Sequence, residues 1–401
     1  MNNFWYAILT IWCAPESIDC LLSKLSKSLR MKKMMLIATI ALAGIALFSC
    51  HRDEHHLPGS DGIVYLDIPD SAYSFYKVSQ LSDKIFNEQA TLGRVLFYDR
   101  SLSINNSVSC GSCHKQALAF ADRVQFSAGF ENRLTGRNTP AIQNLANRSI
   151  LNNPAMTRGA SGRLFWDGRE TNLRNLVIRP ISNHVEMGVA DYSAMIDKLG
   201  ELPYYKELFN DAYGTEEITV ERISDALSVF MQAIRADTTR FDAFIRQKGD
   251  LTALELEGYF LFQSRYDCNH CHNVINDSYF QNSFMNIGLD NPYTDKGLGA
   301  ITGIKAEEGV FRIPNLRNVA ITAPYMHDGR FKTLDAVLEH YSHGIKNDVN
   351  LDPLLKDPVT NGPLRMNITA HDRQALIAFL GTLTDMNMIT NPNFSDPFKI
   401  K

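Results

Sequence analysis

The pentapeptide C-x-x-C-H occurs twice in the sequence and constrains the chain more than any other feature. The copies span residues 110–114 (CGSCH) and 268–272 (CNHCH). At this composition, a chance copy is expected in about three of a thousand such chains, so two copies are not accidental. In this motif both thiols attach to one haem and the histidine ligates its iron. We therefore expect two covalent haem c groups, held by Cys110, Cys113 and His114 and by Cys268, Cys271 and His272.

Paired cysteines have three other uses: a disulfide, a redox-active pair and half of a zinc site. A redox pair does not require the histidine that follows it. A zinc site built from both cysteine pairs would leave both histidines without a role. Haem attachment is the use that accounts for every residue of the repeated motif.

The first 66 residues are predicted to direct export and anchoring. Residues 31–50, MKKMMLIATIALAGIALFSC, combine two lysines, an apolar run and a small residue before Cys50. That pattern is typical of a bacterial lipoprotein signal, so residues 1–30 indicate a start placed upstream of the natural one at Met31. We expect cleavage of residues 31–49, lipidation of Cys50, a polar tether over residues 51–66 and a periplasmic location. An uncleaved membrane anchor is the alternative.

From Cys50 onward the chain is acidic, with 35 Lys and Arg against 42 Asp and Glu. An acidic surface argues against a nucleic-acid partner and suits a basic protein partner. Contact with a membrane is expected only through the lipid.

The remaining body predicts an all-α fold. Apolar residues recur at spacings of three and four in five segments, and Gly or Pro closes these segments. About 350 residues exceed one comfortable core, so two domains are expected. The segments are 190–214, 220–247, 252–265, 332–344 and 370–385.

An internal repeat follows each C-x-x-C-H motif. TPAIQNLA (139–146) and FWDGRETNL (165–173) follow the first copy, and IPNLRNVA (313–320) and MHDGRFKTL (326–334) follow the second. Duplication of a haem-binding unit would explain why one chain carries the motif twice.

Seven stretches resemble the bacterial dihaem cytochrome c peroxidase family, in its MauG-like branch. They are LGRVLFYDRSLSINNSVSCGSCH, TGRNTPAIQN, FWDGR, HVEMG, CNHCH, FRIPNLRNVAITAPYMHDGR and TLDAVLEHY, in family order over residues 86–385. The resemblance implies two cytochrome c-like helical domains, each with one covalent haem, and a calcium ion. We place the peroxidatic domain at 67–235 and the electron-transfer domain at 236–375, with the tail 376–401 packed on the first.

The resemblance also implies roles for single residues. Trp166 is the relay between the haems and Glu186 is the proton shuttle over the first haem. Asn138, Thr322 and Pro324 are the calcium ligands. The plain alternatives are a core tryptophan, a solvated surface glutamate and ordinary turn residues.

Three positions depart from the family pattern. Phe130 stands where many peroxidases have a histidine that blocks the first haem, so we expect that haem to be open, with His184 as the nearest substitute ligand.

Tyr341 stands where peroxidases have a methionine ligand and where MauG-like members also have a tyrosine. It is the expected ligand of the second haem. A packed helix residue is the alternative for Tyr341, and His340 and His343 are its neighbours. Leu176 replaces a glutamine of the peroxide pocket.

The predicted function is reduction of hydrogen peroxide with electrons from a small cytochrome c or a cupredoxin. Oxidative modification of a protein substrate is the second hypothesis, and a dihaem electron carrier or redox sensor is the third. Because the family is often dimeric, a homodimer is an open alternative.

Overall fold

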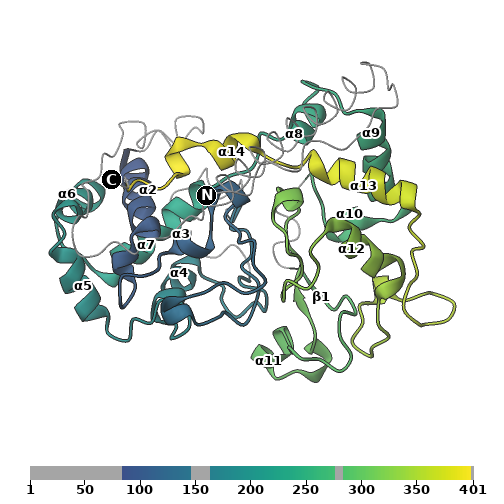
Figure 1. Cartoon of the computed structure of the whole chain (residues 1–401), viewed down its shortest axis with the longest axis horizontal. Coiled ribbons are helices and arrows are strands. Elements are labelled where there is room, and N and C mark those ends of the chain that lie inside the picture. The colour runs from purple at the N-terminus through teal and green to yellow at the C-terminus, as the bar shows by residue number, and fades with distance from the viewer. Residues whose placement is uncertain (1–83, 146–162, 276–282, 399–401) are drawn as a thin grey trace, which may run out of the picture. The chain divides into compact units, whose positions relative to one another are not determined.

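The computed structural model describes residues 84–145, 163–275 and 283–398, and this part of the chain is mostly helical (Figure 1). The predictions for residues 1–66, including Cys50, lie outside the described residues. The helices are α2 (Lys84–Tyr98), α3 (Cys110–Cys113), α4 (Leu173–Ser182), α5 (Tyr192–Gly200), α6 (Pro203–Tyr213), α7 (Val220–Ala233), α8 (Arg240–Ile245), α9 (Ala253–Phe260), α10 (Cys268–Cys271), α11 (Leu298–Thr302), α12 (Leu334–Glu339), α13 (Ala370–Gly381) and α14 (Met386–Thr390).

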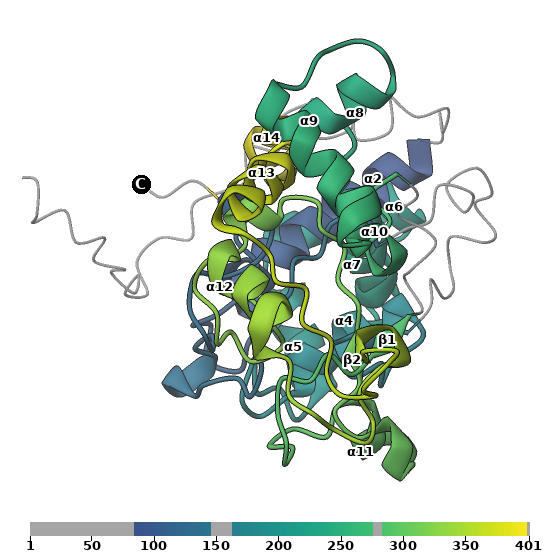
Figure 2. The same cartoon turned by 90° about the vertical axis from the view of Figure 1, so that its right-hand side faces the viewer.

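The described strands are only two residues long. β1 (Phe284–Met285) and β2 (Phe311–Arg312) pair antiparallel, and Figure 2 shows them side by side. The prediction of a largely helical protein is therefore confirmed. No helix in the described ranges is both long and apolar enough to cross a membrane.

All five predicted helical segments are helical, but two of them are broken. Segment 190–214 forms α5 and α6, and Pro203 begins the second of them. Proline lacks a backbone N–H, and in the first turn of a helix this breaks no helical hydrogen bond. Segment 220–247 forms α7 and α8, each capped by a threonine side chain. The spacing of apolar residues thus located the helices, and single residues set their ends.

Two helix pairs cross in the same way. A Cβ placed on Gly93 of α2 would lie 2.0 Å from the carbonyl oxygen of Ala226 in α7, and one on Gly258 of α9 would lie 1.9 Å from that of Ala375 in α13. Only glycine permits such close approach of two backbones. The same contact therefore occurs once in each half of the described chain.

Buried hydrophobic side chains form two large clusters. The first draws on residues 90–236 together with Met388 and Phe394, and the second on residues 241–383. Because Leu376 and Phe379 belong to the second cluster, the predicted tail must be revised. Residues up to 383 pack with the second half, and only the following residues reach the first cluster.

The internal repeat is present in the backbone. Asn144 and Asn318 have positive φ values of 55° and 61°. The side-chain oxygen of Asn144 accepts a hydrogen bond from the N–H of Ala236 (2.8 Å), and that of Asn318 accepts one from the N–H of Asp385 (2.7 Å). Each asparagine thus ties its loop to the residues that follow the last long helix of its half.

The two DGR loops also match. Phe165 and Met326 have positive φ values, as do Gly168 and Gly329, and each loop is closed by an antiparallel bridge. Trp166 in the first loop corresponds to His327 in the second.

Candidate functional site

The first C-x-x-C-H motif forms the short helix α3 and the residue after it. The N–H of Ser109 donates to the hydroxyl of Ser112 at 2.9 Å, which fixes the start of the turn. Nδ1 of His114 lies 2.7 Å from the carbonyl oxygen of Phe120. A carbonyl can only accept, so Nδ1 carries the proton and Nε2 keeps its lone pair for a metal.

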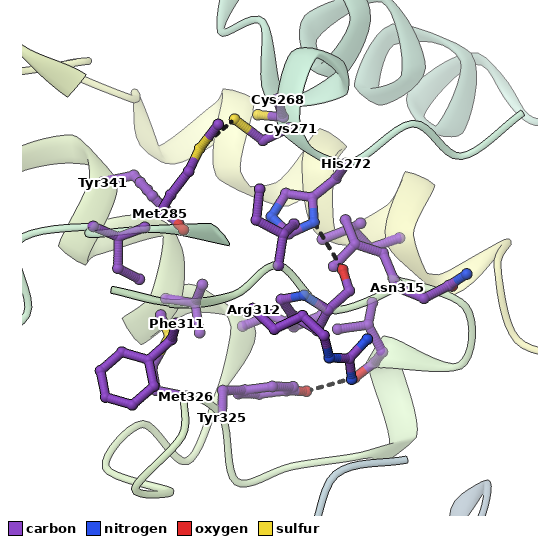
Figure 3. Close-up of a pocket in the computed structure, with 18 of the residues that line it drawn as sticks. Cys268, Cys271, His272, Met285, Phe311, Arg312, Asn315, Tyr325, Met326 and Tyr341 are labelled. Carbon is purple, nitrogen blue, oxygen red and sulfur yellow. Dashed lines mark hydrogen bonds between the residues drawn. The ribbon is translucent and has the colours of Figure 1, made fainter. Parts of the chain in front are cut away.

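The second motif repeats this arrangement on α10. Nδ1 of His272 lies 3.0 Å from the carbonyl oxygen of Pro314, and Figure 3 shows the ring facing the pocket. Burial lowers the pKa of His272 to about 4 and lowers that of His114, so both imidazoles are neutral near pH 7. Both histidines therefore offer Nε2 in the form that ligates iron.

The four cysteines of the motifs are free thiols and half-buried. Burial raises the pKa of Cys110 and Cys268 to about 12 and of Cys113 and Cys271 to about 11. A redox-active pair needs a lowered thiol pKa, so these environments disfavour that alternative. No group of three or more His, Cys, Asp or Glu side chains suited to a metal occurs in the described ranges.

A cavity of about 660 Å³ opens beside the second motif, within the usual range for cofactor sites. Its walls are largely apolar, and Cys268, Cys271 and His272 all line it (Figure 3). The residues present therefore fit a covalently attached haem. His272 would ligate the iron, and the two cysteines would form the thioethers.

Tyr341 lies on the wall of this cavity, in the helical turn His340–Gly344 that follows α12. Burial raises the pKa of its phenol, and nearby Cys268 and Cys271 add to that rise. Its two histidine neighbours are engaged elsewhere. Nε2 of His340 lies 2.9 Å from the carbonyl oxygen of Ile287, and exposed His343 pairs with Glu339.

Trp166 is held from both halves of the described chain. Its indole N–H donates to the carbonyl oxygen of Asn138 (2.9 Å), and its own carbonyl accepts from the N–H of Arg312 (2.8 Å). The side chain lines the same cavity.

The three predicted calcium ligands also line this cavity. The side-chain NH₂ of Asn138 donates to the carbonyl oxygens of Val124 (3.1 Å) and Gln125 (3.3 Å), so its Oδ1 points away from them. The hydroxyl of Thr322 donates weakly to Val319 at 3.4 Å. Pro324 follows a cis peptide bond. Calcium at these oxygens stays a prediction.

Glu186 lies close to the first motif, in the loop after α4. Its Oε1 accepts a hydrogen bond from the side chain of Asn183 at 3.0 Å. Burial raises the pKa of Glu186, while Arg169 and the Asn183 hydrogen bond oppose the rise. Its carboxyl group is near both thiols of the first motif, so its charge also raises the pKa of Cys110 and Cys113.

Phe130 is buried against the Glu186 loop. Its N–H donates to the carbonyl oxygen of Glu186 (2.9 Å), and a Cβ on Gly188 would lie 2.5 Å from its ring. The substitute ligand His184 is exposed, with its carbonyl bound by Arg133. Leu176 is half-buried against the first cluster and offers no polar group there.

Sequence reasoning overlooked three side chains of the cavity wall: Met285, Arg312 and His327. The Met285 sulfur lies 3.4 Å from that of Cys271, and the His327 ring stacks on Phe311 with centroids 3.7 Å apart. Met285 lies in none of the quoted motifs, so no sequence pattern pointed to it as a residue of the site. His327 was visible in the sequence as the counterpart of Trp166 in the repeat.

Comparison with known proteins agrees with this geometry. A family model described as di-haem cytochrome c peroxidase matches residues 87–250. The cytochrome c551 peroxidase of Nitrosomonas europaea is 31% identical over 74% of this chain and 80% of its own length. The methylamine utilization protein MauG of Paracoccus denitrificans is 31% identical over 74% of this chain and 88% of its own.

A solved structure described as a MauG-like protein associated with microbial copper homeostasis is also similar. It has a TM-score of 0.67 and 30% identity, and the match covers 77% of this chain and 93% of that one. The diheme peroxidase BthA from Burkholderia thailandensis shares the fold, with a TM-score of 0.60 at 23% identity. On this evidence the chain belongs to the di-haem cytochrome c peroxidase family and is a peroxidase-like oxidoreductase.

Proposed function

We propose that this protein binds two haem c groups and reduces hydrogen peroxide to water with electrons from a small redox protein. The first haem, at Cys110, Cys113 and His114, is the peroxide site, and the second, at Cys268, Cys271 and His272, receives the electrons. The proposed domains are 67–235 and, with the corrected tail, 236–383. The two clusters of buried side chains, which divide between residues 236 and 241, support that division.

The observation that carries the peroxidase proposal is the neighbourhood of Glu186. A half-buried carboxyl group lies near the two thiols of the first motif, and the side chain at position 130 has no atom that could ligate iron. An electron carrier needs no acid or base there. A peroxidase does, because one proton must move from the near oxygen of peroxide to the departing one.

A haem in the first site would supply an iron that binds peroxide and accepts its oxidising equivalents. Glu186 would take the proton from the near oxygen of peroxide and deliver it to the leaving oxygen. Asn183 holds one carboxyl oxygen through its 3.0 Å hydrogen bond, which orients the group. Partial burial raises the pKa of Glu186, which suits a group that must both take up and release a proton.

Trp166 would carry electrons between the haem sites. Its indole N–H donates to Asn138 and its backbone carbonyl accepts from Arg312, so the two halves of the chain hold its ring and its backbone. Tyr341 would ligate the second iron, where a hard phenolate favours the oxidised metal. Calcium at Asn138, Thr322 and Pro324 would brace the same region.

The proposed location follows from residues 31–50, which read as a lipoprotein signal. The protein would be held on the periplasmic side of the envelope by lipid on Cys50. The acidic body suits a basic donor, either a small cytochrome c or a cupredoxin.

Steady-state assays with the haem-loaded protein test the proposal. Purified protein should oxidise a reduced small cytochrome when hydrogen peroxide is added, and its resting oxidised form should show a high-spin ferric signal. Two low-spin haems and no peroxide turnover would point instead to an electron carrier.

Oxidation of a protein partner is the second candidate function, favoured by Tyr341 in the position of the peroxidase methionine. Incubation with peroxide and no electron donor should then modify a partner protein, as detected by mass spectrometry. Turnover with a small cytochrome at a much higher rate would favour the peroxidase.

A further inference from the structure

Arg312 is a half-buried cation, and no carboxylate among the described residues pairs with it. It lies in β2, and its side chain lines the cavity beside the second motif (Figure 3). In the described part of the chain, its side chain makes one hydrogen bond, from Nε to the carbonyl oxygen of Phe165 at 3.2 Å. The fork of terminal nitrogens is left facing the cavity.

The other arginines of the cavity wall are paired. Arg317 forms a two-point ion pair with Asp242 at 2.7 Å and 2.9 Å. Arg265 lies 3.3 Å from Asp372 and has a side chain 60% exposed. Arg312 alone among these three has no acidic partner in the described ranges.

An unpaired charge in a buried site is costly. Burial lowers the pKa of Arg312 to about 10, so the guanidinium is still protonated near pH 7. A fold retains such a cation most readily when a bound anion completes the pair. A bound group with a negative charge in this part of the cavity would complete the pair.

The position of Arg312 indicates which anion. In Figure 3 Cys268 and Cys271 lie at one end of the pocket, and Arg312 and Tyr325 lie at the other. The two cysteines attach to the vinyl edge of a haem, and the two propionates extend from the opposite edge. A guanidinium also matches a carboxylate through two parallel hydrogen bonds.

We propose that Arg312 is a positioning residue that binds a propionate carboxylate of the second haem. This inference rests on the proposed function, because it assumes a haem at Cys268 and Cys271. Arg312 also holds the backbone of Phe165 and Trp166. Its N–H donates to the carbonyl of Trp166, and its Nε donates to that of Phe165. Arg312 thus joins the propionate edge of the second haem to the backbone that carries Trp166.

A fixed cation beside a haem favours the reduced iron, because the ferric form carries one more positive charge. Arg312 therefore raises the midpoint potential of the second haem. Arg312→Gln should lower that potential, whereas Arg312→Lys keeps the charge and should stay closer to the wild-type value. Arg265→Gln removes the same charge from the exposed rim of the cavity and serves as the matched control, with no comparable shift.

The test is spectroelectrochemical titration of the haem-loaded variants, with resonance Raman spectra of the propionate bending mode. Arg312→Lys replaces a two-point contact with a single one, so that mode should shift even if Arg312→Gln takes up haem poorly. An unchanged mode in Arg312→Lys, or equal potentials in Arg312→Gln and Arg265→Gln, would overturn the inference.

Haem content separates this inference from the function on which it rests. If the wild-type chain carries no haem at Cys268 and Cys271, the proposed function fails and the inference fails with it. If two haems are present and the Arg312 variants behave as the control does, only the inference fails.

Discussion

The indole N–H of Trp166 donates a hydrogen bond to the main-chain carbonyl oxygen of Asn138, 2.9 Å away. This contact joins the DGR loop of the first half to the segment that precedes Pro140. The carbonyl of Trp166 is bound in turn by Arg312 from the second half. The tryptophan is therefore fixed at both its ring and its backbone, which suits the relay role proposed for it.

Trp166→Phe tests the relay. Phenylalanine keeps a ring on the cavity wall but loses the hydrogen bond and is much harder to oxidise. We expect the reduced second haem to be oxidised by peroxide about tenfold more slowly or worse, with both haems still attached. Stopped-flow spectra at the second haem measure this rate. An unchanged rate would show that electrons take another route.

Glu186→Gln tests the proton shuttle. Glutamine keeps the shape and can still contact Asn183, but it cannot accept a proton. We expect kcat/KM for hydrogen peroxide to fall by about 10² to 10⁴. The matched control is Glu131→Gln, since Glu131 lies in the neighbouring loop, is exposed and pairs with Arg133. Equal activity in both variants would remove Glu186 from the mechanism.

The pH profile of the wild-type enzyme should report the same group. Glu186 must be ionised to take the peroxide proton, so kcat/KM should rise with pH as the carboxyl group loses its proton. Because burial raises the pKa of Glu186, this rise should occur above the range of an ordinary carboxyl group. The acid limb should disappear in Glu186→Gln, measured at saturating electron donor.

The sequence predicted those features that depend on local spacing. The C-x-x-C-H motifs and the apolar periodicity of residues 220–247 needed no knowledge of distant contacts. Local spacing could not assign the C-terminal tail to one half of the chain. Residues 376–383 and Met388 belong to different clusters, although only a few positions separate them. Which cluster each joins depends on packing against helices far away in the sequence.

The charge of Arg312 shows the same limit within the site. In the sequence it is one arginine among many, and the next one in the same motif, Arg317, is paired with Asp242. Only the folded chain reveals that Arg312 lines a cavity and has no acidic partner among the described residues. His327 was closer to prediction, because the quoted repeat has it at the position that Trp166 holds in the first copy, and the structure places both on the cavity wall.

The helix crossing in the second half gives a stability prediction. Gly258→Ala places a methyl group 1.9 Å from the carbonyl oxygen of Ala375, so α9 and α13 must separate. We expect a loss of about 1–3 kcal/mol or more, seen as a lower midpoint of thermal unfolding by circular dichroism. Gly381→Ala, at the end of the same α13, meets no atom within 4 Å and should not lower the midpoint. Equal midpoints in the two variants would mean that the crossing tolerates a side chain.

Tyr341→Phe tests ligation at the second haem. The substitution keeps the ring in its half-buried place and removes only the phenol oxygen. Burial raises the pKa of that phenol, so without a metal it would keep its proton, and ligation requires the iron to displace it. If Tyr341 is the ligand, the absorption and spin-resonance spectra of the second haem must change and its potential must rise. His343→Gln alters an exposed side chain two residues away and should leave both unchanged. Should Tyr341→Phe match that control, the second iron takes its sixth ligand elsewhere, and the neighbouring sulfur of Met285 on the same cavity wall becomes the candidate to replace next.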